Sequence, residues 1–346
     1  MKKILIASTC EGAGKTSIIA GITSALKNKY AYIKPLGDRL VYKRKRNIDH
    51  DAMVLLRLLN IDEEPDSISL GFSHSKLRYK YDKKSMGEML KTMAEGASAG
   101  RDVLFIEGGR DLAWGASLHL DALSVARTLG ARLVLVASGD DDRIMDDIRF
   151  IRESVNMTGI DFGGIIINKV QDADDFKTSN LPTIVEMGVT VLGIVPYRAQ
   201  LTSFTMSFLA DRFLARVIAG DEGLNNTVKH IFVGAMSTEE SFRNPMFNKE
   251  DKLLITSGDR SDMIIAALDS DTVGIILTNN IVPPPNIISK ATEKKIPLLL
   301  VPYDTYDVAR QMDNFDALLT HHSGEKLKIL TQLVTDYVKI EGGVIS

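Results

Sequence analysis

Short runs of apolar and β-branched residues alternate with longer stretches of helical periodicity along most of the chain. The runs lack polar alternation, as do strands that are buried on both faces of a parallel sheet. The predicted strands are Lys3–Ala7, Tyr30–Ile33, Val103–Ile106, Leu133–Val136, Gly164–Ile167 and Val191–Ile194. The predicted helices are Lys15–Leu26, Asp51–Leu59, Lys84–Ala99, Ala122–Leu129, Asp142–Val155, Leu181–Met187 and Ser203–Val217. This alternation predicts βαβ crossovers and an α/β fold with a doubly wound parallel sheet.

A second α/β pattern follows the polar, glycine-bearing segment Ala219–Thr227, which we interpret as a linker. Its predicted strands are His230–Val233, Lys252–Ile255, Val273–Leu277 and Leu298–Val301, and its predicted helices are Ser261–Leu268, Asn286–Glu293, Thr305–Met312 and Gly324–Val338. A chain of 346 residues also exceeds one ordinary core. We therefore expect a first domain at 1–218, a linker at 219–227 and a second, smaller α/β domain at 228–346.

Net charge, hydropathy and cysteine content limit the partners and the cellular compartment that we expect for this protein. The net charge of −3 gives no general attraction to nucleic acid or to anionic membranes, so neither is expected as a partner. No apolar stretch approaches the roughly 20 residues of a membrane-spanning helix, and the start MKKILIAS does not read as a signal peptide. The single cysteine, Cys10, excludes a disulfide framework and fits a reducing compartment. We expect a cytoplasmic protein.

The strongest chemical signal is the segment Ser8–Thr16, STCEGAGKT, between a buried-type strand and a helix. This is the context of a P-loop, in which small residues let backbone N–H groups curl around phosphate oxygens and the helix N-terminus attracts negative charge. Lys15 should reach the β- and γ-phosphates of ATP, and the Thr16 hydroxyl should bind Mg²⁺. The residues expected to contact the nucleotide here are Thr9, Glu11, Gly12, Ala13, Gly14, Lys15, Thr16 and Ser17.

Two features of this loop leave alternatives open. The standard pattern has glycine where Thr9 stands, so a plain strand-to-helix turn with a solvated lysine is the competing interpretation. Cys10 is interpreted as a small loop residue and not as a nucleophile, because no histidine lies near it in sequence to activate it.

Several short motifs then follow in a fixed order: Ser8–Thr16, Lys34-Pro35, Asp51-Ala52, Glu107-Gly108-Gly109, and Asn168-Lys169 with Leu192–Pro196. In this order, residues 1 to about 215 resemble the dethiobiotin synthetase-like P-loop family, most closely its branch at the N-terminus of long phosphate acetyltransferases. Thr256–Asp262 and Val301–Tyr306 resemble parts of the DRTGG domain, which accompanies that P-loop domain in those proteins. The acetyltransferase catalytic domain would follow, so acetyl transfer is not expected of this polypeptide alone.

The resemblance implies roles for residues outside the loop. Glu107 and Asp51 would join Thr16 at the Mg²⁺ site, and Glu107 follows a predicted strand at the edge where α/β sheets bind ligands. The competing interpretation of Asp51 is a helix N-cap, with Asp49 as a rival cap. Lys34 would face the transferred phosphoryl group, or else be a solvated lysine at a strand exit.

The same resemblance places Asn168 on the adenine edge and Pro196 in the same base pocket. The expected catalytic residues are Lys15, Lys34 and Glu107, and the expected cofactors are ATP and Mg²⁺.

Other charged segments allow two interpretations each. The basic run Lys43–Arg46, within Arg39–Asn47, is either a solvated loop or an anion-binding segment. In the second domain, Ser257–Asp262 with Arg260 is either a small-ligand anion site or a capped helix start with a surface arginine.

The chain departs from the synthetase where Cys10–Gly12 replaces its Asp-Thr-Glu run, so the substrate contacts made there are not preserved. We therefore favour a nucleotide-dependent regulatory module. The alternative is an ATP-dependent ligase or carboxylase-like enzyme that acts on a small carboxylate or amine. An accessory subunit of a separate acetyltransferase is a third hypothesis, and a homo-oligomer is expected from the resemblance only.

Overall fold

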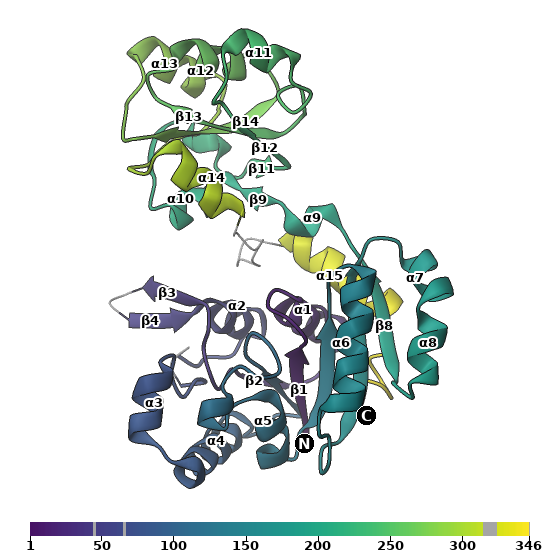
Figure 1. Ribbon diagram of the computed structural model, residues 1–346. Helices are drawn as coiled ribbons and strands as arrows, with labels where there is room; N and C mark the ends of the chain where they lie inside the picture. The colour runs from purple at the N-terminus through teal and green to yellow at the C-terminus, as the bar shows by residue number, and fades with distance from the viewer. Residues whose placement is uncertain (44–45, 65–66, 314–323, 346) are drawn as a thin grey trace. The chain divides into compact units, whose positions relative to one another are not determined.

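The computed structural model describes residues 1–43, 46–64, 67–313 and 324–345. The chain divides into two compact units, Met1–Arg198 with Leu319–Ser346 and Ala199–Leu318 (Figure 1). Each unit has its own sheet, which agrees with two α/β domains.

The first unit is built on a six-stranded parallel sheet of order β2-β5-β1-β6-β7-β8. These strands are β1 (Lys2–Ser8), β2 (Tyr30–Ile33), β5 (Val103–Glu107), β6 (Arg132–Ala137), β7 (Phe162–Val170) and β8 (Val191–Pro196). Its helices are α1 (Lys15–Ala25), α2 (His50–Leu58), α3 (His74–Lys80), α4 (Lys83–Ala97), α5 (Ala122–Leu129), α6 (Asp141–Ser154), α7 (Ala173–Ser179), α8 (Leu181–Glu186) and α15 (Gly324–Tyr337). The order reverses direction at β1, which places right-handed crossover helices on both faces of the sheet (Figure 1).

The six strands predicted for this unit are confirmed within two or three residues at each end. The burial of these strands explains why the sequence could predict them. Every residue of Tyr30–Ile33 and Val103–Glu107 is buried, as are the last five of Lys2–Ser8. Each fully buried aliphatic side chain contributes about 1.5–3 kcal/mol, so continuous apolar runs are favoured here over alternating ones. The sheet therefore presents a rigid carboxyl edge on which side chains can be placed.

The C-terminal helix α15 belongs to the first unit and not to the second, which corrects the predicted domain 228–346. It packs against α1, and the residues after it continue along β8, where Lys339 N–H donates to the carbonyl of Leu192 at 2.7 Å. Periodicity predicted the helix itself, but nothing local in the sequence specifies which core its apolar face covers.

The contact between α1 and α15 leaves no room for a side chain at Gly21. A Cβ there would lie 2.6 Å from Val334 Cγ2 and 2.9 Å from the carbonyl oxygen of Leu330. Gly21→Ala should therefore lower the free energy of unfolding by about 1–3 kcal/mol in urea denaturation, because the helices must move apart.

Gly87 provides the matched control within α4, since a Cβ there meets only Thr128 Cγ2, at 3.8 Å. Gly87→Ala should raise the free energy of unfolding by about 0.5–1 kcal/mol through helix propensity. Equal effects of the two substitutions would contradict the tight packing of α15 on α1.

The second unit contains a five-stranded sheet of order β10-β15-β14-β13-β12, in which only the edge strand β10 is antiparallel. Its strands are β10 (Arg216–Ala219), β12 (His230–Val233), β13 (Lys252–Ser257), β14 (Thr272–Thr278) and β15 (Leu298–Leu300), with a separate pair β9 (Phe204–Thr205) and β11 (Thr227–Val228). Its helices are α9 (Ala199–Thr202), α10 (Met206–Arg212), α11 (Thr238–Arg243), α12 (Ser261–Leu268), α13 (Pro285–Glu293) and α14 (Thr305–Asp313). The four strands predicted for the second domain are confirmed.

Two local predictions are corrected. The predicted helix Ser203–Val217 is helical only over α10, and its ends form β9 and β10. The predicted linker Ala219–Thr227 lies inside the second unit, because Ala219 ends β10 and Thr227 begins β11. In each case a short edge strand forms only when a partner strand distant in sequence is present.

The segment Arg39–Asn47, which contains the basic run Lys43–Arg46, contributes two antiparallel strands over its described residues. Its strands are β3 (Leu40–Lys43) and β4 (Arg46–Asp49), while residues 44 and 45 lie outside the described residues. Strand β4 leads directly into α2, so the two elements carry Asp49 and Asp51 to the edge of the sheet.

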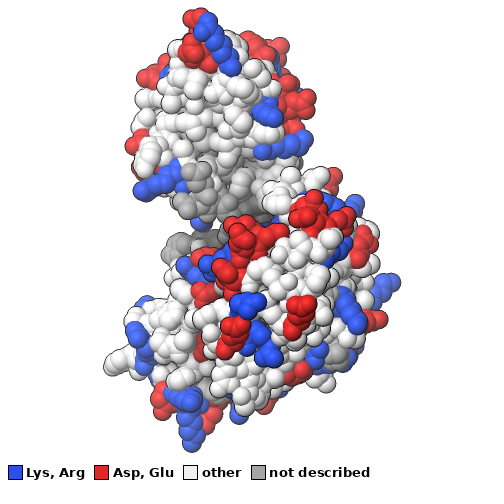
Figure 2. Space-filling model, turned by 45° about the vertical axis from the view of Figure 1, so that its right-hand side comes forward, with Lys and Arg blue, Asp and Glu red and all other residues white. Residues whose placement is uncertain are grey.

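No helix in the described ranges has the length and apolar character needed to span a bilayer. On the face shown in Figure 2, acidic and basic side chains are interspersed.

Candidate phosphate-binding site

The segment between β1 and α1 forms an open turn at the carboxyl edge of the sheet. Gly12 and Gly14 both adopt left-handed backbone conformations, with φ of 74° and 101°. Such φ values favour glycine, so the two glycines of the motif are required by the shape of the turn. Gly14 is also the N-cap residue of α1, and no side chain caps that helix end.

The backbone N–H groups of this turn are uncommitted. From Cys10 to Ser17, none donates a hydrogen bond to another group in the described part of the chain. The preceding N–H, of Thr9, is paired with the carbonyl of Val136 at 3.1 Å. Since backbone donors in folded proteins are normally paired, this run at a helix N-terminus forms a site suited to an anion such as a phosphate.

The side chains of the other predicted loop residues differ in burial and in hydrogen bonding. The Thr9 hydroxyl is buried without a partner, the Glu11 side chain is exposed, and Ser17 is half-buried in the first turn of α1. Cys10 Sγ donates to the carbonyl of Ser138 at 3.3 Å, which agrees with a structural loop residue.

Lys15 is held inside the turn. Its Nζ donates to Ser8 Oγ at 2.9 Å, and the residue is 8% exposed. Burial lowers the pKa of Lys15, an effect opposed by the carboxylates of Glu107 and Asp38. Among the described residues, the ammonium donates a hydrogen bond only to this neutral hydroxyl, so it remains available to a negatively charged ligand.

Lys34 lies in a cage of carboxylates directly after β2. Its Nζ is 2.6 Å from Asp38 Oδ1, 2.7 Å from Asp51 Oδ2, 3.2 Å from Asp49 Oδ1 and 3.8 Å from Glu107 Oε1. Burial would lower the pKa of Lys34, but these carboxylates outweigh burial and raise it well above the ordinary value. At 1% exposed, Lys34 is not a solvated lysine at a strand exit, which removes that interpretation.

Asp49, and not Asp51, is the N-cap of α2. Asp49 Oδ1 accepts hydrogen bonds from the N–H groups of Asp51 and Ala52 at 3.0 and 3.1 Å, and Oδ2 accepts from those of Asp38 and Arg39 at 3.0 and 3.1 Å. The oxygens of Asp49 thus serve local structure. The carboxylate of Asp51 is the one on α2 that remains to face the site.

Glu107 ends β5, and each of its carboxylate oxygens accepts a hydrogen bond. Thr16 Oγ1 donates to its Oε1 and Tyr32 Oη to its Oε2, both at 2.9 Å. The residue is 1% exposed. Burial raises the pKa of Glu107 to about 7, against the opposing charge of Lys34. A carboxyl group with this pKa lies close to its protonation midpoint at neutral pH.

The three predicted metal ligands come together in this cluster. Thr16 is bonded to Glu107, and the ammonium of Lys34 bridges Glu107 and Asp51. Hydroxyl and carboxylate oxygens are the ligands that Mg²⁺ prefers, so the donor set fits this ion. Lys34 supplies the positive charge that holds these carboxylates together in the structure.

Asn168 and Lys169 form a bulge in β7 and hold the phosphate loop from one side. Asn168 Nδ2 donates to the carbonyl of Ala13 and Lys169 Nζ to that of Gly12, each at 2.8 Å. Lys169 has a φ of 62°, so the bulge turns its side chain at some conformational cost. A Cβ at Gly14 would lie 2.4 Å from Asn168 Nδ2, which makes glycine necessary there for a second reason.

The predicted contacts of Asn168 and Pro196 with adenine remain predictions. Pro196 ends β8 and pairs with Val170, so it lies at the same edge of the sheet as the loop. The amide nitrogen of Asn168, however, is used by the loop itself in this structure.

Sequence reasoning missed four residues that shape the site, namely Tyr32, Asp38, Arg110 and Lys169. Arg110 directly follows the motif Glu107–Gly109 and Tyr32 precedes Lys34 by two residues, while Lys169 belongs to the motif Asn168-Lys169 but was given no role of its own. Asp38 lies four residues after Lys34, a spacing that carries no meaning in sequence until the chain is seen to fold back at this point.

In the second unit, Arg260 is engaged by the backbone. Its Nη1 donates to the carbonyl of Gly234 and its Nη2 to that of Met236, both at 2.7 Å. Arg260 is itself the N-cap residue of α12, without a side-chain cap, and Asp262 accepts a hydrogen bond from Thr238. The predicted Asp or Ser cap is therefore not present, and the predicted anion site remains a prediction.

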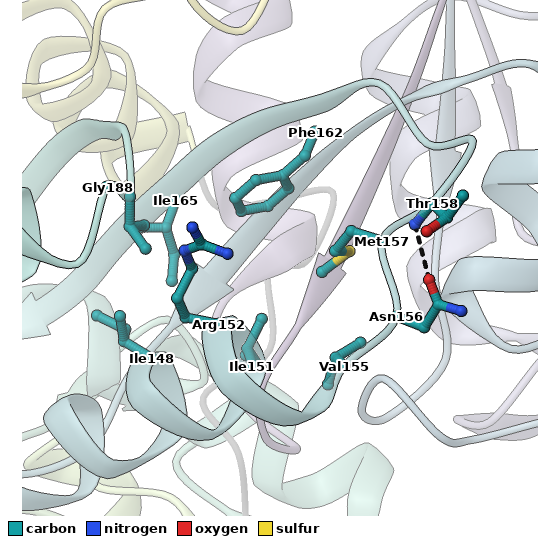
Figure 3. Close-up of a pocket in the computed structure, with 11 residues that line it drawn as sticks. Ile148, Ile151, Arg152, Val155, Asn156, Met157, Thr158, Phe162, Ile165 and Gly188 are labelled. Carbon is teal, nitrogen blue, oxygen red and sulfur yellow. Dashed lines mark hydrogen bonds between the residues drawn. The ribbon is translucent and has the colours of Figure 1, made fainter.

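A separate cavity of about 400 Å³ lies at the opposite, amino-terminal end of β7 and β8 (Figure 3). Its lining residues are Ile148, Ile151, Arg152, Val155, Asn156, Met157, Thr158, Phe162, Ile165, Gly188 and Val189. None of them is a predicted site residue, so this cavity is distinct from the phosphate-binding turn.

Comparison with known families agrees with this geometry. The AAA domain family matches residues 2–205, more than half of the chain. The chain belongs to this family. The DRTGG domain family matches residues 209–315 of the same AAA domain protein. The predicted order of a P-loop domain followed by a DRTGG domain is thus confirmed.

Curated relatives of this AAA domain protein include phosphate acetyltransferases. The enzyme of Nitrosomonas europaea is 22% identical over 368 residues, which cover 99% of this chain and 51% of the relative. That of Synechocystis sp. is 25% identical over 352 residues, which cover 95% and 49%. The chain therefore spans about half the length of these relatives.

Among solved structures, the MinD cell division protein of Aquifex aeolicus aligns with 58% of this chain and 84% of its own, at 18% identity and a TM-score of 0.36.

Proposed function

We propose that the first unit binds ATP with Mg²⁺ and that the protein is a nucleotide-dependent regulatory module. The observation that carries this proposal is the run of uncommitted N–H groups from Cys10 to Ser17 at an uncapped helix N-terminus. Such a run suits a chain of phosphates, whose oxygens accept several hydrogen bonds at once.

Each charged residue has a role in this proposal. Lys15 exchanges its hydrogen bond to the Ser8 hydroxyl for contacts with the β- and γ-phosphates. Thr16, Asp51 and Glu107 hold Mg²⁺, which when bound neutralises phosphate charge. Lys34 stays among the carboxylates and offsets their negative charge beside the Mg²⁺ site. The DRTGG domain presents a small-ligand or protein surface that responds to the nucleotide.

The alternative is an ATP-dependent ligase of dethiobiotin synthetase type. It requires Lys34 to face a substrate, whereas its ammonium is 1% exposed and lies within 3.2 Å of three carboxylates. This arrangement favours the regulatory proposal over the ligase. The two differ in turnover, because a ligase should release ADP quickly only when its small carboxylate or amine is supplied.

A thermal-shift experiment tests nucleotide binding. ATP with Mg²⁺ at 100 times its dissociation constant should stabilise the first unit by about 2.7 kcal/mol and raise its melting temperature by several degrees. Lys15→Ala should remove this shift, because the variant lacks the cation inside the turn.

Lys29→Ala is the matched control, since this exposed lysine directly precedes β2 and lies outside the site. The control should keep the full shift. A wild-type protein that shows no shift at saturating ATP and Mg²⁺ would refute the proposal.

The regulatory part is tested by hydrogen exchange in the full chain. ATP with Mg²⁺ should change amide protection within residues 228–313, beyond the first unit, whereas Lys15→Ala should show no change. Protection changes confined to the first unit would contradict regulation. The cytoplasmic location and the homo-oligomer remain predictions.

A further inference from the structure

Arg110 lies beside the phosphate-binding turn, in the loop that follows β5. Its carbonyl oxygen accepts a hydrogen bond from Ser8 Oγ at 3.1 Å, and the same hydroxyl is the partner of Lys15 Nζ at 2.9 Å. The hydroxyl of Ser8 therefore links the backbone of Arg110 to Lys15, the lysine that we propose binds the β- and γ-phosphates.

An aromatic platform fixes the guanidinium of Arg110. The group lies over the ring of Trp114, with Cζ 4.5 Å from the ring centre, and the ring of His74 packs against Trp114 in a T-shaped arrangement with ring centres 4.9 Å apart. Gly109 allows this approach, because a Cβ there would lie 2.2 Å from Trp114 Cδ1. Stacking on an aromatic face restrains an arginine without using its N–H donors.

The donors of this guanidinium are largely unused. Nη2 donates to the carbonyl of Asp38 at 3.5 Å, the limit of a hydrogen bond, and the buried Nε has no hydrogen-bond partner among the residues that the structure describes. Nε lies 3.6 Å from Glu11 Oε1, in a pair whose side chains are 38% and 54% exposed. A pair this exposed is weak, so a stronger anion can replace Glu11.

Glu11, on the phosphate-binding turn, is the carboxylate that faces Arg110. A carboxylate on the phosphate-binding turn would repel a triphosphate, and Arg110 is the cation that faces it. A phosphoryl group offers an arginine two oxygens at once, with charge-assisted hydrogen bonds that an exposed carboxylate at 3.6 Å does not match.

We propose that Arg110 is a nucleotide-binding residue that contacts the terminal phosphate and makes the site prefer nucleoside triphosphate over diphosphate. This inference rests on the proposed nucleotide binding. On binding, the guanidinium exchanges Glu11 for the γ-phosphate and moves relative to the ring of Trp114. It adds a second cation, after Lys15, at the place where charge differs between ATP and ADP.

Trp114 is the only tryptophan of the chain, so its fluorescence reports directly on this exchange. The full chain is titrated with ATP and with ADP, each with Mg²⁺, and binding is followed by Trp114 emission and independently by thermal shift. The wild type should bind ATP about tenfold more tightly than ADP, the size expected of one charge-assisted contact, and ATP should change the emission more than ADP does.

Arg110→Gln should lose this preference, with ADP affinity kept within about twofold. Lys29→Gln, at an exposed position outside the site, should keep it. An unchanged ratio of ATP to ADP affinity in Arg110→Gln would overturn the role of Arg110 while leaving nucleotide binding intact. Failure of both nucleotides to raise the melting temperature of the wild type would instead overturn the proposed function, and this inference with it.

Discussion

Lys34→Met should lower the free energy of unfolding of the first unit by about 3–5 kcal/mol. The ammonium is 1% exposed and contacts Asp38, Asp49 and Asp51 at 2.6–3.2 Å. Methionine keeps most of the volume and removes the charge, so these buried carboxylates would lose their nearest counter-ion, and among the described residues only Asp51 would keep a second cation nearby, Arg39 at 3.8 Å. Urea denaturation followed by the emission of Trp114, which lies in the same unit, measures the change.

Lys29→Met is the control for this substitution. Lys29 directly precedes the same strand, β2, but its side chain is exposed, so its replacement should change the free energy of unfolding by less than about 0.5 kcal/mol. A loss of stability below about 1 kcal/mol for Lys34→Met would mean that the charge of this lysine is not needed to keep the carboxylates buried. It would contradict the conclusion that Lys34 holds them together.

Glu107→Gln should stabilise the protein increasingly as the pH rises from about 4.5 to 7. Burial raises the pKa of Glu107 to about 7, from an ordinary value near 4.5. In this interval the folded state binds more protons than the unfolded state, so the wild type loses stability as the pH rises. Glutamine cannot ionise, and the difference between variant and wild type should grow by about 3 kcal/mol across the interval, apart from a constant offset.

The measurement is a series of urea denaturations between pH 4.5 and 8 with a chelator present, so that no divalent cation contributes. Glu95→Gln, on the exposed side of α4, is the matched control and should show no comparable rise. A difference between Glu107→Gln and wild type that stays constant with pH would show that Glu107 keeps an ordinary pKa in the fold. A difference that falls as the pH rises would show that folding lowers the pKa of Glu107 and does not raise it.

The phosphate-binding turn is the part of the site that the sequence predicted most completely. Gly12, Gly14 and Lys15 act through backbone conformation and a charge within one short segment, and a local pattern is enough to identify them. The cage around Lys34 was only partly predicted. Asp51 and Glu107 were named through their motifs, whereas Asp38 was not, because its contact depends on how the chain returns to the sheet edge.

For the last helix, too, the sequence predicted the local structure but not its tertiary contacts. The periodicity of residues 324–338 predicted a helix, and α15 is one. Its partner is α1, more than three hundred residues earlier in the chain, and the sequence order suggested the neighbouring DRTGG domain instead. The edge strand β10 was mistaken for helix for a related reason, since its partner β15 lies about eighty residues later.

By itself, the sequence determined the six strands of the first sheet, four of the five strands of the second, most of the helices and the turn between β1 and α1. Each of these depends on residues that are adjacent in the chain, through burial of continuous apolar runs, helical periodicity or glycine conformations. Tertiary structure alone decided that Lys34 lies among four carboxylates, that Asn168 supports the turn and that Arg110 stacks on Trp114 beside Glu11. Those features depend on distances between side chains from different strands and loops, which are set only when the sheet brings its carboxyl ends together.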